Sequence, residues 1–147
     1  MQVRRYSLPD FLVGIVSQEK YERWLRRKTA TLVRRDRKRA GLAVKGEAYR
    51  LAIHEAVAKS GGRDAYTGEP LDWTLLGLYD NAESKAGRSK YKARFALLPT
   101  IDHVDASSAA PNFMICSWRV NDAKNDLTRE EFVQLCCRVV DFHRKRP

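Results

Sequence analysis

Apolar residues recur with helical spacing in two segments of the first 62 residues. In the first, residues 17–40, Ser17 is a suitable N-cap and Gly41 a suitable stop, which predicts one long helix. The apolar positions of this segment are Tyr21, Trp24, Leu25, Leu32 and Val33. Residues 45–60 show the same period and end at Gly61, which predicts a second helix. A shorter apolar stretch, residues 11–16, predicts one or two helical turns before them.

A further helix is predicted at the other end of the sequence. Thr128 and Glu131 have the spacing of a capping box, in which the threonine and the glutamate satisfy each other's backbone N–H groups. The apolar residues that follow share one helix face: Phe132, Leu135, Cys136, Val139 and Val140. We therefore expect a final helix that closes the core.

The pattern between these helices is less regular. Residues 71–79 are apolar enough for a strand or an irregular core segment, and residues 81–92, which are polar and basic with an internal glycine, predict an exposed, mobile loop. Residues 94–104 and 113–117 predict two strands, although Pro99 places the first at an edge or a bend. A short helix is expected from 118 to 125. The fold class is therefore α+β.

Composition supports a globular protein with a core of its own. The chain has 147 residues, 44% of them hydrophobic and 31% charged. It contains no run of 18 apolar residues and no secretory signal, so we expect no membrane partner. Cys116, Cys136 and Cys137 form neither a disulfide framework nor a paired metal clip, which favours a reducing compartment, the cytoplasm.

Positive charge is concentrated near the N-terminus. Of 28 Lys and Arg and 18 Asp and Glu, residues 1–60 hold 15 and 6, a net +9, and residues 61–147 hold 13 and 12, a net +1. We therefore divide the chain into a basic helical region, 1–62, and a second unit, 63–147. This arrangement is expected of a protein that binds the charged backbone of a polyanion such as a nucleic acid. The proposed nucleic-acid contacts are Arg34, Arg35, Arg37, Lys38, Arg39 and Arg119.

Candidate chemistry lies between residues 99 and 126. Asp102 and His103 are adjacent, Asn112 follows nine residues after the histidine, Asn121 nine residues later, and Lys124 one helical turn further on. Phosphodiester hydrolysis requires a base to activate water and a cation to stabilise negative charge. A histidine suits the first task, and carboxylate and amide oxygens suit a hard cation such as Mg²⁺.

The order and spacing of these residues on strand, loop, strand and helix resemble the HNH family of metal-dependent nucleases, with asparagine at the last motif position. The resemblance implies a ββα-metal core that cleaves DNA, most simply double-stranded DNA, with Mg²⁺ or Mn²⁺. It makes His103 the general base, Asp102 and Asn121 the metal ligands, and Asn112 a residue that orders the loop and orients the histidine. Lys124 would contact phosphate. The paired cysteine clips of many relatives are absent, so no structural zinc is expected.

Several alternatives remain open from the sequence. Asn112 could be a turn residue after Pro111, and Asn121 a helix-cap residue. The basic run could be a solvated helix face. The protein could bind nucleic acid through an HNH-like fold without catalysis, or dock its basic helix on an acidic protein partner. A homodimer, which would explain cleavage of both strands, also remains open.

Overall fold

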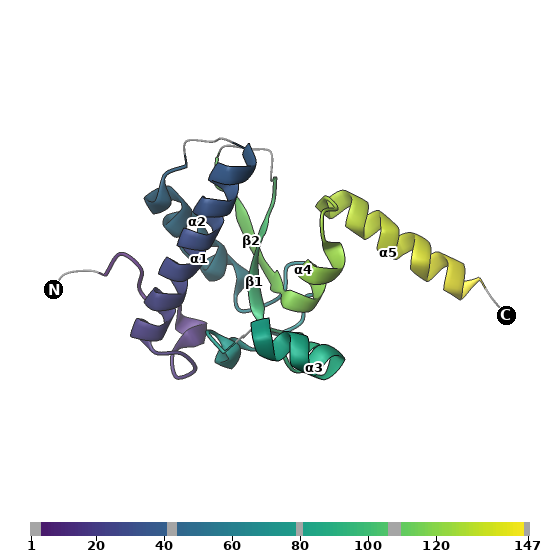
Figure 1. Ribbon diagram of the computed structural model, residues 1–147, viewed down its shortest axis with the longest axis horizontal. Coiled ribbons are helices and arrows are strands. Elements are labelled where there is room, and N and C mark those ends of the chain that lie inside the picture. Colours follow the sequence, from purple (N-terminus) through teal and green to yellow (C-terminus); the bar gives the residue numbers. More distant parts are fainter. Residues whose placement is uncertain (1–3, 41–43, 79–80, 106–109, 146–147) are drawn as a thin grey trace.

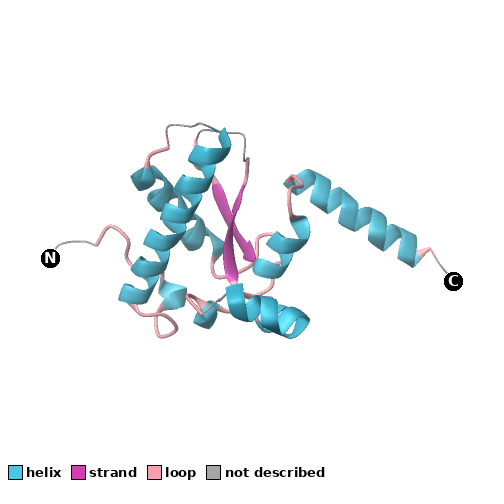
Figure 2. Ribbon diagram, viewed as in Figure 1, coloured by secondary structure: helices cyan, strands magenta, loops and turns pink. Residues whose placement is uncertain are grey.

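The computed structural model describes residues 4–40, 44–78, 81–105 and 110–145 (Figure 1). The elements, in chain order, are η1 (Asp10–Leu12), α1 (Gln18–Ala40), α2 (Gly46–Ser60), η2 (Trp73–Leu75), α3 (Asn81–Arg94), β1 (Pro99–His103), β2 (Phe113–Ser117), α4 (Trp118–Lys124) and α5 (Arg129–Arg144). The combination of helices with one antiparallel pair of strands confirms the α+β fold class (Figure 2).

Helix α1 forms where the sequence predicts it. The Ser17 hydroxyl accepts a hydrogen bond from the Lys20 amide at 3.2 Å, so Ser17 caps the helix. All five predicted apolar positions are buried: Tyr21, Trp24, Leu25, Leu32 and Val33. The predicted stop at Gly41 lies outside the described residues. Because the apolar stripe faces inward, the arginines of α1 are left on its outer surface.

Helix α2 packs beside α1 and ends as predicted. Gly61 has φ of 57°, the left-handed conformation that ends a helix and favours glycine. Tyr49, Ile53 and Val57 of α2 are buried. The earlier apolar stretch, residues 11–16, contributes only the short 3-10 helix η1.

The two strands form an antiparallel hairpin in which Pro99 pairs with Ser117 and His103 pairs with Phe113. In Figure 1 this hairpin lies between α1 and α2 on one side and α4 on the other. One core cluster contains side chains from the helices before residue 62 together with Ile101, Phe113 and Ile115 from the strands. The N-terminal helices therefore bury one face of the hairpin.

The predicted mobile loop at residues 81–92 is wrong, because α3 runs from Asn81 to Arg94. Tyr91 and Phe95, one turn apart, bury their rings against Leu75 and Leu98, with ring centroids 4.6 Å apart. Gly87, which favoured a loop, lies beneath Tyr91, and a Cβ atom there would be 2.8 Å from the Tyr91 Cβ. The predicted strand at 94–104 is correspondingly shorter and starts at Pro99.

The apolar segment at residues 71–79 is irregular rather than a strand. It contains the 3-10 helix η2, which the Asp72 side chain caps by accepting from the Thr74 amide. Trp73 is buried, and its indole N–H donates to the Gly62 carbonyl at 3.1 Å. Tyr79 lies outside the described residues.

The capping box of the last helix is confirmed, but the helix does not close the core. Thr128 accepts from the Glu131 amide at 3.2 Å, and Glu131 accepts from the Thr128 amide at 2.8 Å. No residue of α5, which the structure describes completely, is buried. Figure 1 shows α5 extending away from the body of the protein. The core is already filled by α1, α2 and the hairpin.

Candidate functional site

A cavity of about 650 Å³ lies where the end of β1 meets α4 and the first turn of α5. Its lining includes six of the residues predicted to be functional: Asp102, His103, Asn121, Lys124, Arg35 and Arg39. These residues come from α1, β1 and α4, which are separated along the chain. We call this space the His103 cavity. The fold thus brings the basic helix and most of the predicted chemical residues to one place.

His103 is held by a carboxylate from the N-terminal helix. Its Nε2 atom is 2.8 Å from Oδ2 of Asp36, and the Tyr49 hydroxyl donates to the same oxygen at 2.7 Å. The other ring nitrogen, Nδ1, is 3.5 Å from Nη2 of Arg35. When Nε2 donates its proton to Asp36, Nδ1 carries a lone pair. That lone pair faces the Arg35 guanidinium at 3.5 Å, and it is the site at which a general base would accept a proton.

Asp36 is only 7% exposed and remains a carboxylate. Burial alone would raise its pKa, but the hydrogen bonds from Tyr49 and His103, together with the nearby charges of His103 and Arg35, lower it below the usual aspartate value. Burial and the bond to Asp36 raise the pKa of Tyr49 to about 12. The stabilisation from Asp36 is present above the usual aspartate pKa and is lost as the pH falls through the lowered pKa.

Asp102 faces different partners from its neighbour His103, as expected for consecutive residues of a strand. Its Oδ1 atom is 3.2 Å from the Lys124 ammonium, and its Oδ2 atom accepts from the Tyr66 hydroxyl at 2.7 Å. Both side chains of the ion pair are nearly buried, 9% exposed for Asp102 and 7% for Lys124. Burial and the contact with Asp102 raise the pKa of Tyr66, so Tyr66 stays protonated as a donor. The Asp102 charge is therefore balanced within the protein.

Helix α4 is aligned with the hairpin by a buried carboxylate. Asp64 accepts from the Ser117 amide at 2.6 Å and from the amides of Tyr66 and Thr67. The Ser117 hydroxyl caps α4 by accepting from the Val120 amide. Asn121, one turn into α4, donates its amide N–H to the Thr100 hydroxyl at 3.4 Å. That bond uses the nitrogen of the amide and leaves its oxygen as the atom suited to a cation.

Asn112 does not line the His103 cavity. It is exposed and lines a separate cavity of about 400 Å³ with Phe113 and Arg129. Its contribution to the hairpin comes from the main chain, because its carbonyl accepts from the Val104 amide at 3.0 Å, directly after the histidine. Asn112 thus closes the strand pair just beyond the candidate site.

The predicted nucleic-acid residues divide into groups. Arg35 and Arg39 line the His103 cavity. Arg37 donates to the Val44 carbonyl at 2.7 Å and so holds the chain after α1. Arg34, Lys38 and Arg119 are exposed outside that lining. Arg35 and Arg39 are therefore the two predicted contacts that adjoin the candidate chemistry.

Asp36, an acid within the basic run of α1, was not predicted as a site residue. The signal that could have identified it is its position on the buried stripe of α1, one turn after Leu32 and Val33. An acid at an apolar position needs a partner, because an unpaired buried charge is costly. Tyr49 and Tyr66 were also missed as hydrogen-bond donors to the two site carboxylates.

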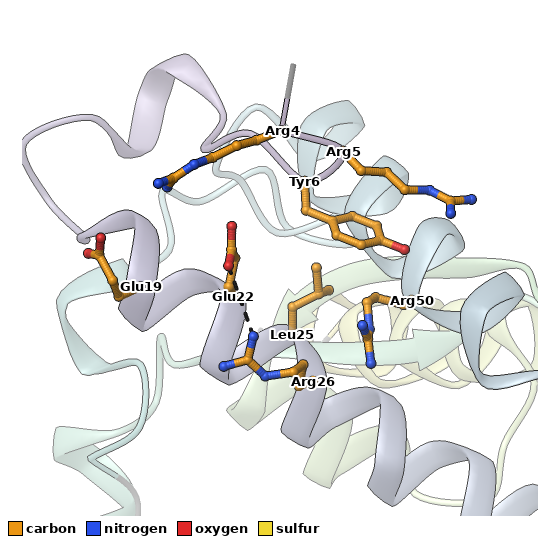
Figure 3. A pocket seen from close by; sticks show the side chains of 8 residues that line it. All are labelled: Arg4, Arg5, Tyr6, Glu19, Glu22, Leu25, Arg26 and Arg50. Carbon is orange, nitrogen blue, oxygen red and sulfur yellow. Dashed lines mark ion pairs between the residues drawn. The ribbon is translucent and has the colours of Figure 1, made fainter. Parts of the chain in front are cut away.

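A different cavity, of about 400 Å³, lies between the N-terminal segment, α1 and α2 (Figure 3). Its residues are Arg4, Arg5, Tyr6, Glu19, Glu22, Leu25, Arg26 and Arg50. The dashed line in Figure 3 marks the ion pair between Glu22 and Arg26, at 3.9 Å. This cavity shares no lining residue with the His103 cavity and contains none of the predicted catalytic groups.

The donor atoms at the His103 cavity suit Mg²⁺ better than a transition metal. Among residues 4–40, 44–78, 81–105 and 110–145 there is no group of three or more His, Cys, Asp or Glu side chains that could hold a metal ion. Mg²⁺ needs only one or two protein oxygens and retains several waters. Asp102 offers a carboxylate, whose oxygens can each accept more than one bond, and Asn121 an amide oxygen. Asp102 and Asn121 thus supply the oxygen types that such an ion takes, and both Asp102 oxygens also accept hydrogen bonds from Lys124 and Tyr66.

Comparison with known proteins identifies no relative. No family model, no curated protein and no solved structure matches this chain. None of the helices in the described ranges has the length and apolar character needed to cross a bilayer. The geometry of the His103 cavity is therefore the feature from which a function can be inferred.

Proposed function

We propose that the protein is a Mg²⁺-dependent endonuclease of the HNH type that hydrolyses phosphodiester bonds in DNA. The observation that carries this proposal is the His103 imidazole, fixed at Nε2 by Asp36 beside a cavity that also contains Asp102, Asn121 and Lys124. DNA as the substrate, in double-stranded form, follows from the resemblance of the motif. The free cysteines agree with a reducing, cytoplasmic location.

In this proposal each residue has a separate task. His103 takes a proton from the attacking water at Nδ1, while Asp36 stabilises the imidazolium that forms. Asp102 and Asn121 would hold the cation, which would supply stabilisation of the negative charge that develops at the phosphate. Lys124 balances the charge of Asp102 and offers an ammonium to phosphate. Arg35 and Arg39, one turn apart on α1, would contact the phosphate backbone beside the scissile bond.

The alternative is a nucleic-acid-binding protein without catalysis. A specific observation favours it: both oxygens of Asp102 already accept hydrogen bonds from within the protein, from Lys124 and Tyr66. A carboxylate neutralised in this way can be purely structural. The two functions agree on DNA binding and differ on cleavage.

Cleavage of supercoiled plasmid distinguishes the nuclease from the non-catalytic DNA-binding protein. We expect the purified chain to nick the plasmid with Mg²⁺, to be inactive in EDTA, and to recover when Mg²⁺ is added in excess. Asn121→Ala should require more Mg²⁺ for half-maximal cleavage, because one of two protein ligands is lost, with DNA affinity unchanged. Binding without cleavage in Mg²⁺ and Mn²⁺ would favour the alternative, and no binding at low salt would favour an adaptor that docks on an acidic protein.

The two cavity arginines should account for a defined part of DNA affinity. For Arg35→Gln combined with Arg39→Gln, we expect the slope of log affinity against log salt to fall by about 2, because each phosphate contact contributes roughly one unit. The measurement is fluorescence anisotropy with labelled duplex in EDTA over a salt series. The matched control is Arg23→Gln with Arg27→Gln, which has the same spacing on α1 but lines another cavity. Equal effects in both pairs would mean diffuse attraction rather than a binding face.

A further inference from the structure

Helix α5 presents an apolar face that stays largely exposed. Phe132, Leu135, Val139 and Phe142 follow one another at intervals of three, four and three residues, so they share one side of the helix. Leu135, Val139 and Phe142 are 40%, 51% and 55% exposed. Val133 and Val140, at 46% and 42%, are also exposed, but they lie outside this row, on the flank of the helix beyond Cys136. Exposed apolar residues that gather on one helix face mark an interaction site.

The first turn of α5 is fixed to the body of the protein, and the rest projects from it (Figure 1). The Phe132 ring lies 5.8 Å from the Tyr66 ring in an edge-to-face arrangement. Arg129 and Glu130 line the His103 cavity. The capping box at Thr128 defines where the helix begins. A docked partner would therefore meet a helix of defined direction rather than a loose tail.

We propose that this face is a self-association surface on which α5 of a second copy of the chain packs antiparallel. An interval pattern of three, four and three reads the same in both directions. Reversing the second helix therefore puts Phe132 opposite Phe142 of the second copy, and Leu135 opposite its Val139. Each large ring then meets a ring and each aliphatic side chain meets an aliphatic one, as in the seam of a short coiled coil.

The charges of α5 favour the antiparallel arrangement over the parallel one. The acidic residues of the first turn are Glu130 and Glu131, whereas His143 and Arg144 are the basic residues of the last turn and Lys145 follows them. Antiparallel packing brings the acidic end of each helix to the basic end of the other. The two helix dipoles then point in opposite directions, which is also favourable. Parallel packing would join like ends, which costs energy.

The contact is small, and this limits its strength. The four seam residues span ten positions of one helix, about 15 Å at 1.5 Å per residue. An interface of this length lies below the size of a standard stable one, so we expect a reversible pair with a dissociation constant of roughly micromolar order or weaker. The pairing is independent of the proposed nuclease function.

Sedimentation of the full chain, without DNA or metal, tests the proposal. We expect the weight-average mass to rise from 16.9 kDa towards twice that value as concentration increases through the micromolar range. Leu135→Lys with Val139→Lys should stay monomeric and keep the wild-type thermal midpoint, because both residues are already exposed. The control is Gln134→Lys with Cys137→Lys, which adds the same charge on the opposite face and should still associate.

The cysteines report which side of α5 forms the contact. Cys136 borders the seam near its midpoint, and antiparallel pairing brings it close to Cys136 of the second copy. Cys137 lies roughly half a turn from the centre of the seam, and Cys116 is buried. Diamide, which accepts the two electrons and two protons released by two thiols, should give a disulfide-linked dimer. Cys136→Ser should abolish that dimer and Cys137→Ser should not.

Three results would overturn the proposal. The first is a mass that stays at 16.9 kDa at every concentration, in which case the face serves another partner or another segment. The second is association of the Leu135→Lys, Val139→Lys variant as strong as that of the wild type. The third is cross-linking that depends on Cys137 rather than Cys136, which would place the contact on the other side of α5.

Discussion

Replacing His103 with alanine is expected to slow Mg²⁺-dependent plasmid cleavage by about 10²- to 10⁴-fold, the usual contribution of a general base. In the proposed mechanism the imidazole takes the proton of the attacking water at Nδ1, since its Nε2 is bonded to Asp36 at 2.8 Å. DNA affinity should stay within a factor of about two, because the positive charges that contact phosphate remain. Single-turnover cleavage and anisotropy on the same preparation measure both quantities.

Two further variants define what the histidine does. His143→Ala, at an exposed histidine of α5, should cleave at the wild-type rate. Asp36→Asn keeps the shape of the side chain but removes the charge that balances an imidazolium, so we expect cleavage to fall by about 10- to 100-fold, as for other residues that orient a reacting group. If His103→Ala cleaves as fast as the wild type, the base is elsewhere and the enzyme proposal fails.

The elements that the sequence predicted well are those defined by neighbouring residues. Helix α1 follows from the Ser17 cap and a continuous apolar stripe, and the start of α5 follows from a capping box within four residues. Helix α3 was mistaken for a loop because its sequence is mostly polar, and the large apolar residues that anchor it are Tyr91 and Phe95, which follows its last residue. The residues that pack with these two rings, Leu75, Leu98 and Trp118, come from other parts of the chain.

The candidate site divides in the same way. The motif from Asp102 to Lys124 lies within one hairpin and the helix that follows it, so its spacing could be recognised in the sequence. Four of its five residues line one cavity. The partner of His103 could not be predicted from the sequence, because Asp36 is 67 positions away, on a helix of the basic helical region. The Tyr66 hydroxyl on Asp102 comes from 36 positions away. Hydrogen bonds between distant segments depend on tertiary packing, which no local pattern encodes.

The largest effect on stability is expected at the ion pair between Lys124 and Asp102. Lys124→Met keeps the length of the side chain but leaves the Asp102 carboxylate nearly buried, with only the Tyr66 hydroxyl as a close donor among its described contacts. Breaking a buried pair by removing one partner typically costs about 3–5 kcal/mol. For a chain of this size we expect the thermal midpoint to fall by roughly 10 °C. Urea denaturation at neutral pH measures the free energy.

The matched control is Lys92→Met, which breaks the exposed pair with Asp122, whose side chains are 49% and 52% exposed. That change should cost less than about 1 kcal/mol. Asp102→Asn combined with Lys124→Met should recover most of the loss, because no uncompensated charge remains. A Lys124→Met cost no larger than that of Lys92→Met would mean that water reaches Asp102 freely.

The same variant also tests whether Asp102 binds the cation. A ligand that binds the folded state raises its stability according to its affinity. In Lys124→Met the carboxylate has lost its ammonium, so Mg²⁺ should bind there more tightly and raise the thermal midpoint more than it does in the wild type. Asp102→Asn with Lys124→Met, which lacks the carboxylate, should show no such gain. Equal Mg²⁺ shifts in all three proteins would remove Asp102 from the proposed ligand set, and the proposed metal site would lose its only carboxylate.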